Sequence, residues 1–364
     1  MDLKEKAKKL PSSPGVYLMK DSTDGIIYVG KSKNLKSRVS SYLQNSNHQS
    51  NKVVKLVKHL KDFAIIQTDT EFEAFMLESQ LIKELKPIYN KLMKSPLIYT
   101  YIRIQIDKEH PRIELSSDLE ETANGLYFGP FTSRASVEKA INGLKEFFTI
   151  DCSHGSPNKT PCLNYSLGLC IGHCFKQSTM EQYYIILKRI IALLKGEETS
   201  ILDEMEQKMI EASANFEFEK AAKYRDYSRS IKSLVNKERT IEFAKENHNI
   251  VVVEFINDNT MKLFLIQGNK VLFEGRAELK CASRNEMSTW IRSNILIYFT
   301  MEDQMSITIT KYEIDETQII YNYLKSSVNH YLFIPDEWLF PVNHQKMDKA
   351  LAKFLNEIID GSTF

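Results

Sequence analysis

The chain has 364 residues, 43% of them hydrophobic and 26% charged, so it can form two or three packed domains and is not a disordered protein. Its 48 lysines and arginines balance 47 acidic residues, which excludes a chain-wide positive field and requires any nucleic-acid-binding surface to be local. No apolar run of about 18 residues occurs, and the first ten residues contain no apolar signal core, so we expect a cytoplasmic protein without membrane contact.

A β-hairpin followed by a basic helix is predicted for residues 15–43. The segments GVYLM and IIYVG are short strands joined by a turn at Asp24-Gly25, which places Tyr17 and Tyr28 on adjacent strands. In the helix that follows, Arg38 and Tyr42 are four residues apart and share one face. The lysines between the hairpin and Arg38 make this region locally basic, as a phosphate-binding surface requires.

A second helix is predicted from Thr70, whose pairing with Glu73 is a capping pattern, to a stop at Pro87. Glu78 lies within the apolar stripe of this helix, which comprises Ala74, Phe75, Leu81, Ile82 and Leu85. Burying an unpaired carboxylate costs several kcal/mol, so Glu78 needs a cationic partner or a metal ion. The alternative is a glutamate at the rim of the stripe.

The order of these motifs, with an asparagine in PIYN after them, resembles the GIY-YIG nuclease module. Within that superfamily, YVGKSKNLKSRVSSYL and FMLESQLIKELKPIYN resemble the N-terminal module of UvrC, the incision subunit of bacterial nucleotide excision repair. The resemblance implies paired tyrosines, a basic neighbour, a phosphate clamp, a supporting hydroxyl, a metal ligand and an orienting side chain. These roles fall in turn on Tyr17 and Tyr28, Lys31, Arg38, Tyr42, Glu78 and Asn90.

Phosphodiester hydrolysis accounts for these residue types. One Mg²⁺ or Mn²⁺ ion held by Glu78 can act as a Lewis acid, and Arg38 offers a planar fork to the phosphate oxygens. A tyrosine can act as the base only if its pKa of about 10 is lowered, which Lys31 or the metal could do. The sequence does not decide between Tyr17 and Tyr28, and in the alternative both merely pack between strand and helix.

Residues 98–150 form a small linker module in this interpretation. IYTYIRIQI predicts a strand, Gly129-Pro130 a turn, and ASVEKAINGLKEFF a helix that Ser133 could cap. YFGPFTS also resembles UvrC, where such a segment joins the nuclease module to a cysteine motif.

Four cysteines lie close together in residues 151–178. Thiolates at this spacing can bind zinc tetrahedrally or hold an iron–sulfur cluster, and the spacing does not choose between them. The resemblance to UvrC implies a [4Fe-4S] cluster, with zinc as the alternative. His154 and His173 are possible substitute ligands that fit solvated loop residues better, and Cys281 fits a core or surface thiol. The proposed cluster ligands are Cys152, Cys162, Cys170 and Cys174.

Residues 179–246 are predicted to be helical, with an antiparallel hairpin at about 200–236 that begins at a Ser200–Asp203 capping pattern and turns near Asn215. An isolated hairpin of this size buries too little to be stable, so it needs a partner. FEFEKAAKYRD resembles the UVR motif, by which UvrC pairs with a similar hairpin of UvrB. The alternative partner is the chain itself. The matching positions are Phe216, Phe218, Ala222, Arg225 and Asp226.

Residues 247–364 predict an α/β domain with a three-stranded meander and helices near 285–298, 316–327 and 347–359. It resembles the part of UvrC that follows the UVR motif, for which a degenerate RNase H-like fold is one candidate. Glu254 could imitate an RNase H carboxylate, but no acidic companion pair is evident, so we expect a non-catalytic domain. We also expect no second nuclease site, because the sequence stops before that motif of UvrC.

Together these patterns predict a multidomain α/β protein: a GIY-YIG module (1–97), a linker module (98–150), a cysteine motif (151–178), a helical region (179–246) and a C-terminal α/β domain (247–364). The predicted function is a metal-dependent DNA endonuclease that makes one incision, on the 3' side of a lesion, when UvrB presents damaged double-stranded DNA. The alternative is a non-enzymatic protein that binds UvrB and modulates repair. A mobile-element GIY-YIG nuclease is disfavoured, because it would leave the hairpin and cysteine motif without a role.

Overall fold

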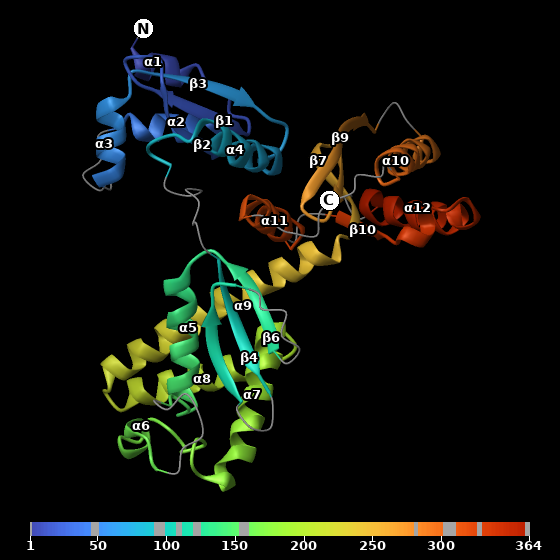
Figure 1. The fold of residues 1–364 in the computed structure, drawn as a ribbon. Coiled ribbons are helices and arrows are strands. Elements are labelled where there is room, and N and C mark those ends of the chain that lie inside the picture. Colours follow the sequence, from blue (N-terminus) through green and yellow to red (C-terminus); the bar gives the residue numbers. More distant parts are fainter. Residues whose placement is uncertain are drawn as a thin grey trace. The chain divides into compact units, whose positions relative to one another are not determined.

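The structure is a computed structural model that describes residues 2–44, 51–90, 99–106, 111–118, 125–152, 160–279, 283–300, 311–325 and 330–360. The chain divides into two compact units. One is formed by Met1–Ser95 together with Phe243–Phe364, and the other by Pro96–Glu242. Figure 1 follows their helices and strands along the sequence. Within the described part, no helix combines the length and apolarity that a membrane crossing needs. We call residues 2–90 the N-terminal module, 99–242 the middle unit and 243–360 the C-terminal domain.

The N-terminal module contains a three-stranded antiparallel sheet in the order β2-β1-β3. The strands are β1 (Gly15–Lys20), β2 (Ile26–Ser32) and β3 (Asp62–Gln67). The predicted turn between β1 and β2 is confirmed: Asp24 adopts a left-handed conformation with φ 64°, and Asp21 Oδ1 accepts hydrogen bonds from the backbone N–H groups of Thr23 and Gly25 at 2.8 and 3.0 Å.

Helices cover both faces of this sheet. One face, with Tyr17, Met19 and Phe63, packs against α1 (Leu3–Lys8), α2 (Leu35–Tyr42) and α3 (Asn51–His59). The other face, with Val16, Leu18 and Val29, packs against α4 (Glu71–Leu85). The sheet therefore forms the centre of the module, with α2 and α4 on its opposite faces.

Helix α4 begins as predicted, with Thr70 and Glu73 forming a reciprocal capping box. Its predicted apolar stripe is wrong in part. Ala74 and Ile82 are buried against the sheet, but Phe75 and Leu85 are exposed, and Phe72, which was not predicted in the stripe, is buried. The physical reason is that α4 packs on two sides, so its apolar residues do not share one face.

The middle unit has a second antiparallel sheet in the order β5-β4-β6. Its strands are β4 (Thr100–Gln105), β5 (Arg112–Ser116), which the sequence analysis missed, and β6 (Gly125–Phe131). The predicted turn at Gly129-Pro130 is wrong, because both residues lie within β6. Helix α5 (Arg134–Phe147) follows, and Ser133 caps it as predicted.

Helices complete the middle unit: α6 (Leu163–Ser166), the 3₁₀ turn η1 (Gln177–Thr179), α7 (Met180–Lys195), α8 (Ser200–Ala214) and α9 (Phe218–Glu246). The turn near Asn215 is confirmed, because α8 ends there and Phe216 has φ 61°. The Ser200 cap is wrong: Thr199 is the capping residue, without a side-chain hydrogen bond, and the Ser200 hydroxyl contacts Glu198 instead.

The C-terminal domain has an antiparallel sheet in the order β10-β7-β8-β9. The meander β7 (Asn249–Asn257), β8 (Thr260–Gln267) and β9 (Lys270–Glu278) was predicted, and β10 (His330–Ile334) was not. The predicted helices are α10 (Arg284–Tyr298), α11 (Lys311–Leu324) and α12 (His344–Asp360), with 3₁₀ turns η2 (Asp336–Leu339) and η3 (Pro341–Asn343) before α12. The RNase H-like comparison stays a prediction.

Candidate functional site

Three tyrosines form a compact cluster on one face of the N-terminal sheet. Tyr17 on β1 is opposite Gly30 on β2, so Tyr17 and Tyr28 are diagonal neighbours on the same face. Tyr42, on the last turn of α2, lies over them: its hydroxyl is 3.0 Å from that of Tyr17, and its ring centroid is 6.5 Å from that of Tyr28. Two strands and a helix thus bring three phenols to one place.

Gly30 permits this arrangement. A Cβ atom at position 30 would lie 2.3 Å from the Tyr17 hydroxyl oxygen, inside van der Waals contact. The Tyr17 ring therefore crosses directly over the backbone of β2. This explains in steric terms why a glycine follows Tyr28 and Val29 in the sequence.

Arg38 projects from α2 beside the tyrosines. Its Nε lies 3.4 Å from the Tyr17 hydroxyl, to which it donates, and its guanidinium carbon lies 5.0 Å from the centre of the Tyr42 ring. The residue is otherwise exposed. One edge of the guanidinium is therefore fixed by the cluster, while the rest can reach an incoming anion.

Burial dominates the acidity of the tyrosines. It raises the pKa of Tyr17 far above its ordinary value of 10.0, and the neighbouring phenols raise it further. It raises the pKa of the less enclosed Tyr28 to about 12, with the charge of Glu78 among the further causes. The expectation that Lys31 lowers a tyrosine pKa is therefore not met within the protein itself.

The side chain of Lys31 binds residues of α4 instead of the tyrosines. Its ammonium nitrogen lies 2.8 Å from Oε1 of Glu71 and 3.8 Å from the centre of the Phe75 ring, both on α4. Neither Glu71 nor Phe75 was predicted as a partner of this lysine. Their spacing of four residues, on the helix that also carries Glu78, was the signal that could have revealed them.

Side chains from α4 and from the segment after it form hydrogen bonds with backbone groups on the outer edge of β2. Oδ1 of Asn90 accepts from the Val29 N–H at 3.0 Å, and Nδ2 of Asn90 donates to the Val29 carbonyl at 2.8 Å. At Lys31, two residues further along the same strand, the backbone N–H donates a hydrogen bond to Oε1 of Glu78 at 3.0 Å. Because both the oxygen and the nitrogen of its side-chain amide bind the backbone, Asn90 supports the strand. Glu78 is the carboxylate near the tyrosines, since its charge affects the pKa of Tyr28.

Glu78 has the surroundings of a cation ligand. Burial raises the pKa of its carboxyl group above 4.5, although the Lys31 N–H and the charges of Lys31 and Arg38 act in the opposite direction. Among the residues that the structure describes, no lysine or arginine forms an ion pair with Glu78, so this partly buried carboxylate, with one oxygen bound to an amide, is undercompensated. A divalent ion would supply the missing positive charge, so these residues fit a metal site.

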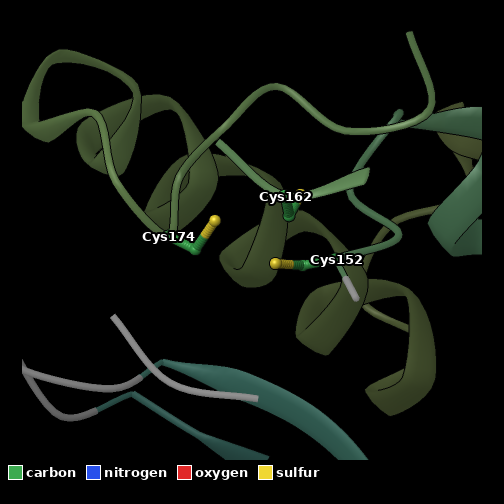
Figure 2. Close-up of side chains that lie close together, drawn as sticks. All are labelled: Cys152, Cys162 and Cys174. Atoms are coloured by element: carbon green, nitrogen blue, oxygen red, sulfur yellow. The ribbon is translucent and has the colours of Figure 1, made fainter. Parts of the chain in front are cut away.

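The cysteine motif forms a second candidate site, in the middle unit. The sulfur atoms of Cys152, Cys162 and Cys174 lie within 4.8 Å of one another, and Figure 2 shows the thiols of Cys152 and Cys174 directed toward the same space. Cys170 is buried in the same cluster, and its sulfur accepts from the Gly172 N–H at 3.4 Å. Three of the four predicted ligands thus meet at a spacing that fits a zinc ion or an iron–sulfur cluster, whereas Cys170 packs in the same buried cluster but its sulfur does not belong to this group of three.

His173 was predicted to be a solvated loop residue, but it is buried. It is only 9% exposed, its ring stacks on Tyr183 at 3.8 Å between centroids, and Nδ1 lies 3.7 Å from the Cys170 sulfur. The imidazole therefore packs under the cysteine cluster. His154 and Cys281 lie outside the described residues.

The helical hairpin formed by α8 and α9 has a buried base and an exposed tip. At the base, Ile231 and Val235 join the core of the middle unit, and the Tyr227 hydroxyl donates to Glu146 of α5 at 2.7 Å. The tip carries Phe216 and Phe218, which are 79% and 63% exposed. The base of the hairpin thus packs on its own chain, as the alternative expected, and the tip is exposed in the described structure, while pairing with UvrB stays a prediction.

A groove of about 570 Å³ runs along the tip between the two helices. Of the residues matched to the UVR motif, Phe218, Ala222 and Arg225 line it, and Asp226 binds the Arg225 guanidinium at 2.9 Å. An apolar groove with exposed aromatic residues at its mouth is suited to bind another helix.

Family comparisons agree with this architecture in chain order. Residues 13–91 match the UvrC-like GIY-YIG domain, residues 99–193 the middle domain of the UvrC/Cho excinuclease, and residues 199–234 the UvrB/uvrC motif. The chain is 34% identical over 348 residues to UvrABC system protein C of Acetivibrio thermocellus, covering 92% of this chain and 55% of that protein. It is 37% identical over 277 residues to the Clostridium tetani protein of the same name, covering 74% and 44%.

The solved structures that match include the GIY-YIG N-terminal endonuclease domain of UvrC from Thermotoga maritima, bound to its catalytic divalent cation, magnesium. It is 39% identical and covers 24% of this chain and 94% of that domain, with a TM-score of 0.22. The chain spans about half the length of these two curated relatives. The chain belongs to the UvrC family and carries its GIY-YIG module, middle domain and UVR motif, as the three matched segments and the identity to these relatives show.

Proposed function

We propose that this protein is a metal-dependent DNA endonuclease that makes one incision, on the 3' side of a lesion, when UvrB presents damaged double-stranded DNA. The observation that carries the proposal is the meeting of Tyr17, Tyr28 and Tyr42 with Arg38 on one side and the undercompensated carboxylate of Glu78 on the other. The magnesium bound by the Thermotoga maritima domain supports the same chemistry here.

Each residue has a part in phosphodiester hydrolysis. A Mg²⁺ or Mn²⁺ ion at Glu78 would supply Lewis-acid stabilisation of charge on the phosphate and leaving oxygen. Arg38 binds the non-bridging phosphate oxygens through the guanidinium edge that Tyr17 leaves open. Asn90 and the Lys31 N–H hold the edge of β2 and the Glu78 carboxylate in register, so the charges need little reorganisation during the reaction.

Tyr28 is the better base of the two paired tyrosines. Tyr17 is only 1% exposed, so an attacking water reaches its hydroxyl poorly, whereas Tyr28 is only partly buried. The pKa of Tyr28 is also the one that responds to the charge of Glu78, so neutralising that charge makes the Tyr28 phenol more acidic. Tyr28 can therefore take the proton of the attacking water, while Tyr17 and Tyr42 orient Arg38.

The pH dependence of nicking tests this assignment. The base must be deprotonated, and burial raises the pKa of Tyr28 to about 12, above working pH. The active fraction, and with it the single-turnover nicking rate, should rise by nearly tenfold per pH unit from about pH 6.5 until the pKa in the metal complex is reached. Tyr28→Phe should abolish the rise. A flat profile in the wild type would contradict a tyrosine base.

The cysteine site is proposed to hold a [4Fe-4S] cluster, with zinc as the alternative, bound by Cys152, Cys162, Cys170 and Cys174. Anaerobically purified protein should be brown and contain about four iron atoms per chain. Cys162→Ala should remove the colour and most of the iron, because Cys162 is fully buried at the start of α6. Colourless protein with one zinc ion would establish the alternative, and protein without either metal would refute both.

One assay separates the enzyme from a non-enzymatic modulator of UvrB. The purified protein is incubated with UvrB, ATP, magnesium and a duplex with a single lesion, and the nicks are mapped on both strands. We expect one magnesium-dependent nick on the 3' side of the lesion. Binding to UvrB without any nick would support the modulator instead.

A further inference from the structure

Helix α4 has a second packing face, turned away from the nuclease sheet and toward the C-terminal domain. Phe72, in its first turn, is 4% exposed and stacks on Tyr323 of α11 with ring centroids 4.0 Å apart and an interplanar angle of 9°. The same ring meets Phe264 of β8 edge-on at 5.1 Å. These contacts join residues about 190 to 250 positions apart into one core cluster within a single compact unit.

A buried lysine reinforces this contact. Lys262 of β8 is 6% exposed, and its ammonium lies 3.0 Å from Oδ2 of Asp69 and also contacts Oε1 of Glu73. The other oxygen of Glu73 accepts the backbone N–H groups of Asp69 and Thr70 at 2.7 and 3.0 Å, which caps α4. The C-terminal domain therefore binds the group that fixes the start of the helix.

The far end of α4 is held as well. Lys83, in the last turn, forms an ion pair with Glu316 of α11, and both side chains are largely buried. Glu254, for which no catalytic role was expected, accepts a hydrogen bond from the Tyr323 hydroxyl at 2.6 Å. It thus orients the ring on which Phe72 stacks, which is a structural role.

We propose that the C-terminal domain is a positioning element for the nuclease centre: it clamps α4 at both ends and so fixes Glu78, which lies between the two clamps. The tyrosines lie on the sheet face opposite α4, so the clamp supports the centre without covering it. Glu73, Lys83, Lys262 and Glu316 are positioning residues in this scheme. The predicted effect on nicking rests on the proposed function, whereas the effect on α4 and on cation binding does not.

Charge reversal at the far clamp tests the proposal in the full-length chain. Lys83→Glu and Glu316→Lys each place like charges together, and the double variant restores an attractive pair. Lys353→Glu is the matched control, because Lys353 faces Glu357 in an exposed pair on α12. Hydrogen exchange in residues 71–85 and 311–324 should become at least about tenfold faster in each single variant and return toward the wild-type rate in the double variant.

Cation binding supplies the second measurement. Mn²⁺ affinity should fall by several-fold in both single variants and recover in the double variant, and nicking should follow the same order. Long-range charge cannot mimic this result, because Lys83→Glu adds negative charge near Glu78 and would strengthen Mn²⁺ binding, whereas Glu316→Lys would weaken it. Unchanged exchange in both single variants would overturn the clamp. Faster exchange with unchanged Mn²⁺ affinity would overturn its positioning role, and wild-type protein that binds Mn²⁺ without nicking would refute only the proposed function.

Discussion

Glu78→Gln should abolish nicking while leaving the fold intact. The amide has nearly the shape of the carboxylate, and its oxygen can still accept from the Lys31 N–H, which lies 3.0 Å from Oε1 of Glu78. What disappears is the negative charge that binds the divalent ion, and loss of such a ligand removes several kcal/mol of stabilisation, or a factor of about 1,000 in rate. Single-turnover nicking of a lesion-bearing duplex with UvrB measures the loss.

The fold of this variant can be followed separately. Burial raises the pKa of Glu78, so the metal-free protein gains nothing from the charge, and the melting temperature of the variant should equal or slightly exceed that of the wild type. Glu84→Gln is the matched control, since Glu84 is an exposed residue of the same helix that contacts Gln80. Nicking at the wild-type rate by Glu78→Gln would show that the assignment of the metal ligand is wrong.

Patterns of residues close in sequence were sufficient to predict much of the secondary structure of the N-terminal module. The turn at Asp24-Gly25 and the Thr70–Glu73 capping box depend on residues close in sequence, and both occur as predicted. The position of Glu78 in an apolar helix was also enough to mark it as unusual. Its contact with the Lys31 N–H was not predictable in the same way, because it depends on which strand lies at the sheet edge.

Long-range packing accounts for the errors. Phe75 was expected in the core and is instead exposed beneath the Lys31 ammonium, whereas Phe72 is buried by a domain that begins about 170 residues later. Helical periodicity identifies faces of α4 but does not say that two of them are covered. Strand β10 was missed because it lies at the edge of its sheet and its residues His330 and Tyr331 are exposed, which weakens the alternation.

The pKa values of the tyrosines also depend on long-range packing that the sequence pattern does not reveal. A lysine three residues after Tyr28 suggested a lowered phenol pKa, but Glu71 and Phe75 of α4 hold that ammonium, and burial then dominates. The residue types were readable from the sequence, but the sign of the pKa shift depended on contacts made by another helix.

Phe218→Ala should weaken binding to UvrB by about 30-fold or more. The Phe218 ring is 63% exposed at the mouth of the groove between α8 and α9, so it has no core of its own to stabilise and is available to a partner hairpin. Truncating a buried aromatic residue at an interface costs about 2 kcal/mol or more, and each 1.4 kcal/mol is about tenfold in affinity. Titration of the variant with the C-terminal hairpin of UvrB measures the change.

Phe340→Ala is the matched control for this experiment, because Phe340 is 62% exposed and belongs to the C-terminal domain. Neither variant should change the melting temperature, the metal content or partner-independent nicking, since neither ring is in a core. Only Phe218→Ala should lose the incision that depends on UvrB. Equal binding by the two variants would mean that the tip of the hairpin is not the UvrB site. The exposed rings of Phe216 and Phe218 would then need another partner, because the base of the hairpin is already occupied by its own chain.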